Sequence, residues 1–234
     1  NEEILQNLKG DMIKSRADAK LNQSRCFGAL QRYMIYGSDF IRRTTLTDPV
    51  LQGLTSEQLL AKIGDLMGKQ HEVLYYGPQD EAEVKAALAA HHKVAADLQP
   101  LEKKFSTLQP TDENKVMLAQ YDAKQLYYLQ YANLGKQFDV TAAPEITLYN
   151  EYFGGGMNTI VFQEMREARG LAYSAWANLA IPTNAKGDYY YMAFIATQND
   201  KMQKAIEAFD EIINNMPESE KAFDIAKEAL ISRL

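Results

Sequence analysis

Residues 150–174 read NEYFGGGMNTIVFQEMREARGLAYS, the most distinctive stretch of this 234-residue sequence. Apolar residues at helical spacing predict a short helix that ends at Gly154–Gly156, and a second helix that is capped by Asn158 and ends at Gly170. Three glycines in a row can also cradle a phosphate at the start of a helix. However, the lysine and the following serine or threonine of a P-loop are missing, and the glycines follow a helix and not a strand. We therefore expect a tight turn between two closely packed helices, a position that favours glycine.

Two strands and two helices are predicted after this stretch. Apolar residues alternate over residues 173–181, and residues 187–197 are apolar on both sides, which is typical of a covered, central strand. The link at residues 182–186 makes the two strands a hairpin. Apolar residues then recur at helical spacing over residues 202–216 and 223–230, which predicts two amphipathic helices.

The preceding part of the chain mixes helices with short strands. Helices are predicted over about the first 35 residues, after a capping box formed by Thr55 and Gln58, and after a capping residue at Asp80. Strands are predicted at residues 73–76, 116–121 and 126–132. The whole pattern predicts an α+β fold, with a mostly antiparallel sheet and helices packed on one face.

Composition and charge narrow the class of protein. Hydrophobic residues make up 46% of the chain and charged residues 24%, as in a globular protein with one large domain or one and a half small ones. The net charge of −6, without a block of basic residues, argues against nucleic acid as a partner. No apolar run approaches the roughly 20 residues that cross a bilayer, so we expect no membrane span.

The positions of the three histidines indicate whether this chain can hold a catalytic zinc. His71 is followed by Glu72, but Tyr75 stands where a His-Glu-x-x-His zinc helix needs its second histidine. The inverted order, His-x-x-Glu-His, also fails, because neither His91 nor His92 directly follows a glutamate. We expect no metal ligands in this chain, and two solvated histidines at the end of a helix.

The stretch 150–174 resembles the pitrilysin/insulinase family of zinc metallopeptidases, which includes bacterial processing-type proteases and mitochondrial processing peptidase. In that family a helix with an Arg-Glu-x-x-Gly-Leu-x-Tyr pattern is followed by a hairpin and two amphipathic helices, the order predicted here. The resemblance implies similar α/β domains in two halves, with a His-x-x-Glu-His zinc motif in the N-terminal half. It makes residues 71–234 a metallohydrolase-like α/β repeat of the C-terminal half, truncated at its C-terminus, and residues 1–70 the helical tail of the preceding repeat. The last helical pattern reaches Leu234 without a glycine, asparagine or proline to stop it, so we expect the natural sequence to continue beyond Leu234.

The resemblance also implies a role for Arg166 and Tyr173, because their spacing matches an arginine and a tyrosine that reach the substrate near the zinc in the family. A guanidinium and a phenolic hydroxyl are donors that can hold a peptide carbonyl and the oxyanion formed when water attacks it. Without the resemblance, Arg166 would be a helix-end cation favoured by the helix dipole, and Tyr173 an ordinary strand aromatic. Arg169 is expected to be a surface or helix-end charge. The turn and the substrate-binding chamber wall are expected to include Gly154, Gly155 and Gly156.

The first hypothesis is therefore the C-terminal, zinc-free part of a zinc metalloendopeptidase that hydrolyses peptides in a closed chamber. Its partner would be the N-terminal half that carries the zinc, in the same chain or in a partner subunit, and the fragment alone would be inactive. The second hypothesis is a non-catalytic structural or assembly subunit of the same superfamily, which the retained Arg166 and Tyr173 disfavour. A third, a peptide-binding module that adds a strand to the sheet edge, has no positive support in the sequence. Localisation stays open, and would be periplasmic or cytoplasmic in a bacterium.

Overall fold

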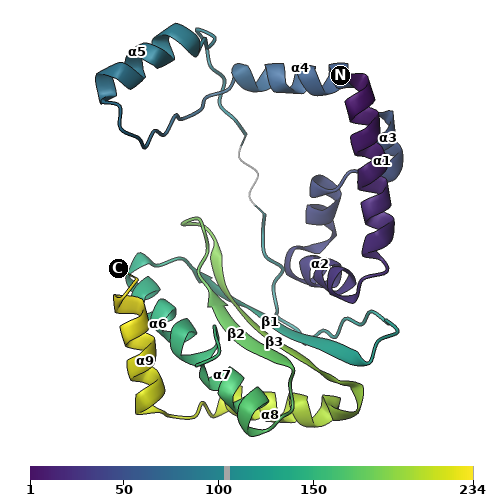
Figure 1. Ribbon diagram of the computed structural model, residues 1–234, viewed down its shortest axis with the longest axis vertical. Coiled ribbons are helices and arrows are strands. Elements are labelled where there is room, and N and C mark those ends of the chain that lie inside the picture. The colour runs from purple at the N-terminus through teal and green to yellow at the C-terminus, as the bar shows by residue number, and fades with distance from the viewer. Residues whose placement is uncertain (103–105, 234) are drawn as a thin grey trace. The chain divides into compact units, whose positions relative to one another are not determined.

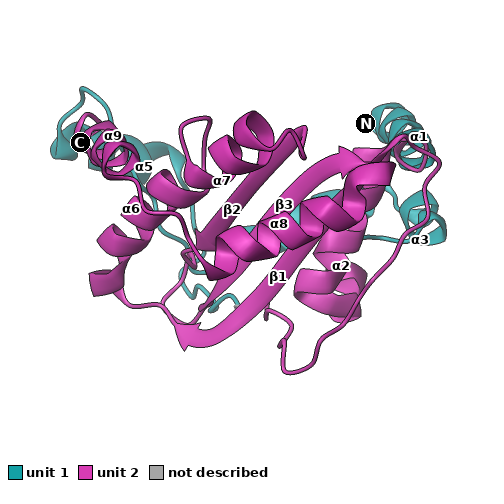
Figure 2. Cartoon of the chain, turned by 90° about the horizontal axis from the view of Figure 1, so that it is seen from below, with its two compact units in different colours: residues 1–18, 45–105 teal, residues 19–44, 106–234 magenta. Residues whose placement is uncertain are grey.

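The computed structural model describes residues 1–102 and 106–233. The chain forms two compact units, Asn1–Asp18 with Thr45–Phe105, and Ala19–Thr44 with Ser106–Leu234 (Figures 1 and 2). These units follow the contacts between residues. The division at residue 70, which the family resemblance implies, stays a prediction. The predicted truncation at Leu234 falls outside the described residues.

Within its described residues, the second unit is built on a three-stranded antiparallel sheet. Its strands are β1 (Gln125–Gln137), β2 (Ser174–Ala180) and β3 (Asp188–Gln198), in the order β1–β3–β2 (Figure 1). β2 and β3 form the predicted hairpin, with Ala177 opposite Ala193, and β1 pairs with the other edge of β3. The central position predicted for residues 187–197 is confirmed, and the apolar residues on both sides of β3 suit it.

Helices that follow β1 cover one face of this sheet (Figure 2). They are α6 (Ala143–Phe153), α7 (Ile160–Phe162) with the π-helical turn η2 (Gln163–Ala168), α8 (Met202–Asn214) and α9 (Glu220–Ile231). The core that they form with the sheet buries each large apolar side chain at a gain of about 1.5–3 kcal/mol. Its almost fully buried members include Phe153, Val161, Met165, Ile195 and Phe209. The predicted α+β fold, an antiparallel sheet with helices packed on one face, is confirmed.

The opposite face of the sheet is partly covered by α2 (Gln23–Thr44), a helix of the same unit. The Phe27 ring contacts the rings of Tyr127 on β1 and Phe194 on β3, at centroid distances of 5.4 and 5.8 Å. Both partners alternate along their strands with residues that face the core, so they point away from it. α2 is bent at Gly37, where φ is 74°.

A buried lysine connects two helices of the first unit. α1 (Glu2–Ala19) carries Lys9, which is 3% exposed, and the Lys9 ammonium donates hydrogen bonds of 2.8 Å to the carbonyls of Gln52 and Leu54. These carbonyls lie at the end of α3 (Asp48–Gly53), where a helix leaves carbonyl groups without partners. The cation therefore satisfies the end of α3 and is favoured there by the helix dipole.

Two other helices of this unit begin where the sequence predicts. α4 (Ser56–Met67) starts at the predicted capping box, in which the side chains of Thr55 and Gln58 each accept from the backbone N–H of the other. α5 (Glu81–His91) starts at Asp80, whose carboxylate accepts from the N–H of Glu83 at 2.8 Å. Local capping signals thus fixed both helix starts.

Two of the predicted strands are wrong. Residues 73–76 and 116–121 form neither helix nor strand, and Leu74, Val116 and Leu118 are each about nine-tenths exposed. A β-forming sequence becomes a strand only where a neighbouring strand offers backbone partners. In the described part of the chain, neither segment has such a neighbour. The strand predicted at residues 126–132 is confirmed by β1.

Gly154 lies where the end of α6 meets β2. The Ala177 N–H donates to the Gly154 carbonyl at 3.1 Å, and a Cβ added to Gly154 would lie only 1.9 Å from the Ala177 carbonyl oxygen. Only glycine allows the two backbones to approach so closely. Asn150 fixes the same edge, because its side-chain amide donates to the Leu179 carbonyl at 2.9 Å and accepts from the Leu179 N–H at 2.8 Å.

The residue that begins the next helix differs from the prediction. Thr159, and not Asn158, occupies the N-cap position of α7. The Thr159 hydroxyl donates to the Gly156 carbonyl at 2.7 Å, so it closes the glycine turn and makes no cap hydrogen bond to the helix.

Replacing Gly154 with alanine is expected to destabilise the protein by about 3 kcal/mol, because the added methyl group would collide with the backbone of Ala177. Thermal unfolding followed by circular dichroism should show a melting temperature lower by about 6–12 °C. Gly156→Ala is the matched control, because a Cβ at Gly156 meets no atom within 4 Å. A change within about 0.5 kcal/mol is expected there. Equal stability of the two variants would contradict the close contact between α6 and β2.

Candidate functional site

Arg166 lies in the π-helical turn η2, which follows α7 without a break. This turn is wider than an α-helical turn, because the Arg169 N–H donates to the carbonyl of Glu164, five residues earlier, at 3.2 Å. The N–H groups of Leu171 and Ala172 both donate to the Met165 carbonyl, at 2.9 and 3.2 Å. Turns of this kind are rare and are frequently found at functional sites. The hydrophobic spacing predicted a helix here, but it does not distinguish a π turn from an α turn.

Gly170 ends the turn and redirects the chain to the sheet. Its φ of 59° is a left-handed conformation that glycine adopts without strain, as predicted for the end of this helix. Three residues later, the Tyr173 N–H donates to the Ala196 carbonyl of β3 at 2.7 Å. This bond places Tyr173 directly before β2, beside the end of the helix.

The structure brings Arg166 and Tyr173 together. The Arg166 Cζ lies 5.9 Å from the centre of the Tyr173 ring. Both side chains are accessible: the Arg166 side chain is 46% exposed and Tyr173 is 72% exposed. A cation and a phenol therefore share one accessible patch of the second unit.

Phe162, which the sequence analysis missed, completes this cluster. The Arg166 Cζ lies 5.0 Å from the centre of the Phe162 ring, within the range of a cation–π interaction. The available signal was the spacing: an aromatic residue four positions before an arginine lies on the same side of a helix. The Glu167 carboxylate is a weaker neighbour, since its Oε1 lies 3.6 Å from the Arg166 Nε.

Arg169 has different surroundings from Arg166. Its Nη1 donates to the Glu211 carboxylate of α8 at 2.7 Å, and its Nε lies 3.5 Å from the Glu164 carboxylate. The hydrogen bond to Glu211 raises the pKa of Arg169, and the same bond lowers the pKa of Glu211. Arg169 is thus the helix-end charge that was expected, and it ties the end of η2 to α8.

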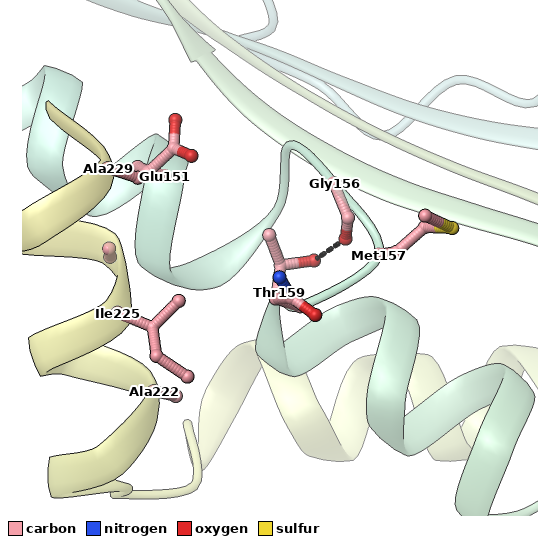
Figure 3. Close-up of a pocket in the computed structure, with 9 residues that line it drawn as sticks. Glu151, Gly156, Met157, Thr159, Ala222, Ile225 and Ala229 are labelled. Atoms are coloured by element: carbon pink, nitrogen blue, oxygen red, sulfur yellow. Dashed lines mark hydrogen bonds between the residues drawn. The ribbon is translucent and has the colours of Figure 1, made fainter. Parts of the chain in front are cut away.

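The three candidate glycines have different positions. Gly154 contacts β2, and a Cβ on Gly155 would lie 3.2 Å from the Asn150 carbonyl oxygen. Gly156, in contrast, lines a pocket of about 240 Å³ between the glycine turn and α9 (Figure 3). The other residues around this pocket are Glu151, Met157, Asn158, Thr159, Ala222, Ile225, Ala226 and Ala229.

The pocket is apolar along α9 and carries one charged group. Figure 3 shows Ile225, Ala222 and Ala229 on one side and the glycine turn, with its hydrogen bond from Thr159 to Gly156, on the other. The Glu151 carboxylate is paired with the Arg233 guanidinium at 2.6 Å. The size and lining suit a single apolar side chain better than a larger ligand, since sites for small molecules usually start near 300 Å³.

The described residues do not fit a zinc ion. Nowhere in residues 1–102 and 106–233 do three histidine, cysteine, aspartate or glutamate side chains converge as metal ligands would. In the first unit His71 and His92 do meet, with their Nε2 atoms 2.7 Å apart, and the His71 Nδ1 lies 2.7 Å from the Lys69 carbonyl. Two ligands are fewer than a structural or catalytic zinc site uses. In the same described ranges, the helices are too short or too polar to cross a membrane.

Comparison with known families gives one match over most of the chain. The model of a family described as "Peptidase M16 inactive domain" matches residues 53–230. This range contains the glycine turn, η2, the hairpin and both C-terminal helices. No curated protein was found to match the chain.

Three solved structures of similar fold illustrate the likeness. A peptidase M16 inactive domain from Pseudomonas fluorescens is 21% identical, with a TM-score of 0.69 over 99% of this chain and 56% of that chain. A conserved protein from Enterococcus faecalis V583 is 14% identical, with a TM-score of 0.65 over 100% of this chain and 55% of that chain. A protease from Helicobacter pylori is 14% identical, with a TM-score of 0.52 over 80% and 46%. The chain therefore spans about half the length of these proteins.

Proposed function

The chain belongs to the peptidase M16 inactive-domain family, and from this premise we propose that it is the substrate-binding part of a zinc metalloendopeptidase. The resemblance to the pitrilysin/insulinase family is thereby confirmed, as is the assignment to the C-terminal part. In the proposal, the zinc-carrying N-terminal half is a separate part of the same chain or a partner subunit.

The observation that carries the proposal is the convergence of Arg166 and Tyr173 on one accessible patch. The guanidinium and the phenolic hydroxyl are both donors, so together they can bind the carbonyl oxygen of an extended peptide. A purely structural arginine would be expected to pair with carboxylates, as Arg169 does with Glu211 and Glu164. Arg166 instead lies against two aromatic rings, and its carboxylate neighbour, Glu167, lies 3.6 Å from Nε and accepts no hydrogen bond from it.

The proposed chemistry assigns a limited task to this chain. Zinc held by the other half would supply the Lewis acid and the activated water of a metallopeptidase. Arg166 and Tyr173 would orient the peptide and donate hydrogen bonds to the carbonyl oxygen as negative charge develops on it. Donors fixed before the reaction stabilise that charge more than they stabilise the neutral substrate, and this difference increases the rate. The chain alone is accordingly expected to be inactive.

The pocket beside Gly156 gives the proposal a second element. An apolar pocket of about 240 Å³ next to the glycine turn suits an aliphatic side chain of the bound peptide. In this view Gly154 and Gly155 shape the turn, and Gly156 forms part of the wall that contacts the substrate.

A non-catalytic structural or assembly subunit is the alternative. The word "inactive" in the description of the matched family and the lack of a three-ligand metal site among the described residues are compatible with it. The alternative gives Arg166 and Tyr173 no role in turnover, so their replacement distinguishes the two functions.

In the complete protein with its zinc-carrying half, Arg166→Ala and Tyr173→Phe are each expected to lower the turnover number by about 100-fold, because each removes a donor to the developing oxyanion. The turnover number is measured with a quenched-fluorescent peptide. Zinc content and the circular dichroism spectrum should stay unchanged.

Arg169→Ala is the neighbouring control. It removes an exposed ion pair and should lower stability by less than about 1 kcal/mol without lowering turnover. Wild-type turnover in both Arg166→Ala and Tyr173→Phe would refute the clamp and favour the structural subunit.

Filling the pocket tests its proposed role in specificity. Ala229→Phe is expected to lower kcat/KM by about tenfold for peptides whose leucine enters the pocket, with little change for the matching alanine peptides. The comparison uses a panel of peptides in which each apolar residue is replaced by alanine in turn. Ala229→Ser leaves the pocket open and should keep the wild-type preference. An identical preference in Ala229→Phe would show that the substrate does not use this pocket.

A further inference from the structure

We propose that Phe162 is a positioning residue that holds the Arg166 guanidinium in the orientation the substrate requires. This inference rests on the proposed function, since it concerns the residue through which Arg166 would act. It is carried by the aromatic slot, here defined as the rings of Phe162 and Tyr173, against which the guanidinium lies at 5.0 and 5.9 Å from the two ring centres.

The Phe162 ring is a firm support because the chain around it is anchored in the core. Its neighbour Val161 and the nearby Met165 are both fully buried, while Phe162 itself is half-buried. The backbone that carries the ring is therefore fixed by packing on the sheet. Tyr173, which is 72% exposed, cannot give the same support by itself.

The surroundings of the guanidinium leave its N–H groups available. Within the described residues, the Arg166 guanidinium donates no hydrogen bond to the rest of the chain, and the Glu167 oxygen at 3.6 Å from Nε lies beyond hydrogen-bond distance. An arginine on the surface samples many rotamers, which must be lost when it binds. A cation–π contact restrains the flat face of the guanidinium without using its N–H donors. This is the arrangement that a donor to a peptide carbonyl needs.

The contrast with Arg169 supports the assignment. The two arginines are three positions apart, yet Arg169 donates a hydrogen bond of 2.7 Å to the Glu211 carboxylate, whereas Arg166 donates none to Glu167. A carboxylate hydrogen-bonded to Arg166 would restrain the side chain equally well but would compete with the substrate. Aromatic rings restrain it and do not compete.

The slot can be tested by chemical rescue in the complete protein with its zinc-carrying half. Arg166→Ala leaves the slot empty, and added guanidinium chloride, far below denaturing concentrations, is expected to restore part of the lost turnover. Sodium chloride at the same ionic strength should restore none. In the double variant Phe162→Leu/Arg166→Ala the rescue should be lost, whereas Phe162→Tyr/Arg166→Ala keeps an aromatic ring and should retain it.

The single variants give the corresponding effect with Arg166 in place. Phe162→Leu is expected to lower kcat by about three- to tenfold with a smaller change in KM, because the guanidinium is present but less well oriented. Phe162→Tyr should stay close to wild type. If Phe162→Leu disturbed only the packing of the core, it would lower stability. Guanidinium would then still rescue turnover in the double variant Phe162→Leu/Arg166→Ala.

A spectroscopic measurement on the chain described here needs no activity. Ring currents from Phe162 should shift the Arg166 Nε–H proton resonance upfield, and Phe162→Leu should remove most of that shift while Phe162→Tyr keeps it. If Phe162→Leu weakens the fold of the complete protein, this measurement still tests whether the Phe162 ring contacts the Arg166 guanidinium.

The outcomes separate the two proposals. Wild-type turnover in both Arg166→Ala and Tyr173→Phe would refute the clamp of the proposed function, and with it the positioning role of Phe162. A slow Arg166→Ala enzyme together with wild-type kcat in Phe162→Leu would leave the clamp standing and refute the positioning role. Rescue that persists without the Phe162 ring, or no rescue in Arg166→Ala, would also refute the slot.

Discussion

The contact between the backbones of Gly154 and Ala177 is the constraint on which the rest of the second unit depends. Any side chain at Gly154 would occupy the space of the Ala177 carbonyl, and the hydrogen bond from Ala177 to Gly154 holds the end of α6 against the outer edge of β2. Asn150 reinforces this junction through both backbone groups of Leu179. Because β2 also begins with the residue after Tyr173, the same junction fixes the glycine turn, the following helix and the candidate site relative to one another.

Two arginines on the same short helical segment have different contacts and different proposed roles. Arg169 is tied to α8 by Glu211, so it connects the helix to its neighbour in the core layer. Arg166 lies against Phe162 and Tyr173 and keeps its donors available. The π-helical turn and the left-handed Gly170 together bring the end of the helix back to the sheet next to Tyr173. In the proposed function, this difference separates an arginine that stabilises the fold from one that contacts the substrate.

The sequence predicted the parts of this arrangement that local signals determine. The helix stops at Gly154 and Gly170, the hairpin and the capping box at Thr55 all follow from residues close together in the chain. The strands predicted at residues 73–76 and 116–121 fail because strand formation depends on a distant partner, which hydrophobic pattern alone does not supply. Arg166 and Tyr173 were named through the family resemblance. Phe162 was missed although its spacing from Arg166 was a signal. The Gly156 pocket and the π turn were missed because they depend on packing and backbone geometry that hydrophobic spacing does not specify.

The central claim is that Arg166 and Tyr173 contact the substrate from the zinc-free half of a peptidase. The most direct test is a crystal structure of the complete protein with an uncleaved peptide, trapped by replacing a residue of the zinc-carrying half that is needed for turnover. The account predicts that the Arg166 guanidinium and the Tyr173 hydroxyl both lie within about 3 Å of carbonyl oxygens of the peptide, at hydrogen-bond distance. A peptide bound elsewhere in the chamber, with both side chains remaining in solvent, would contradict it.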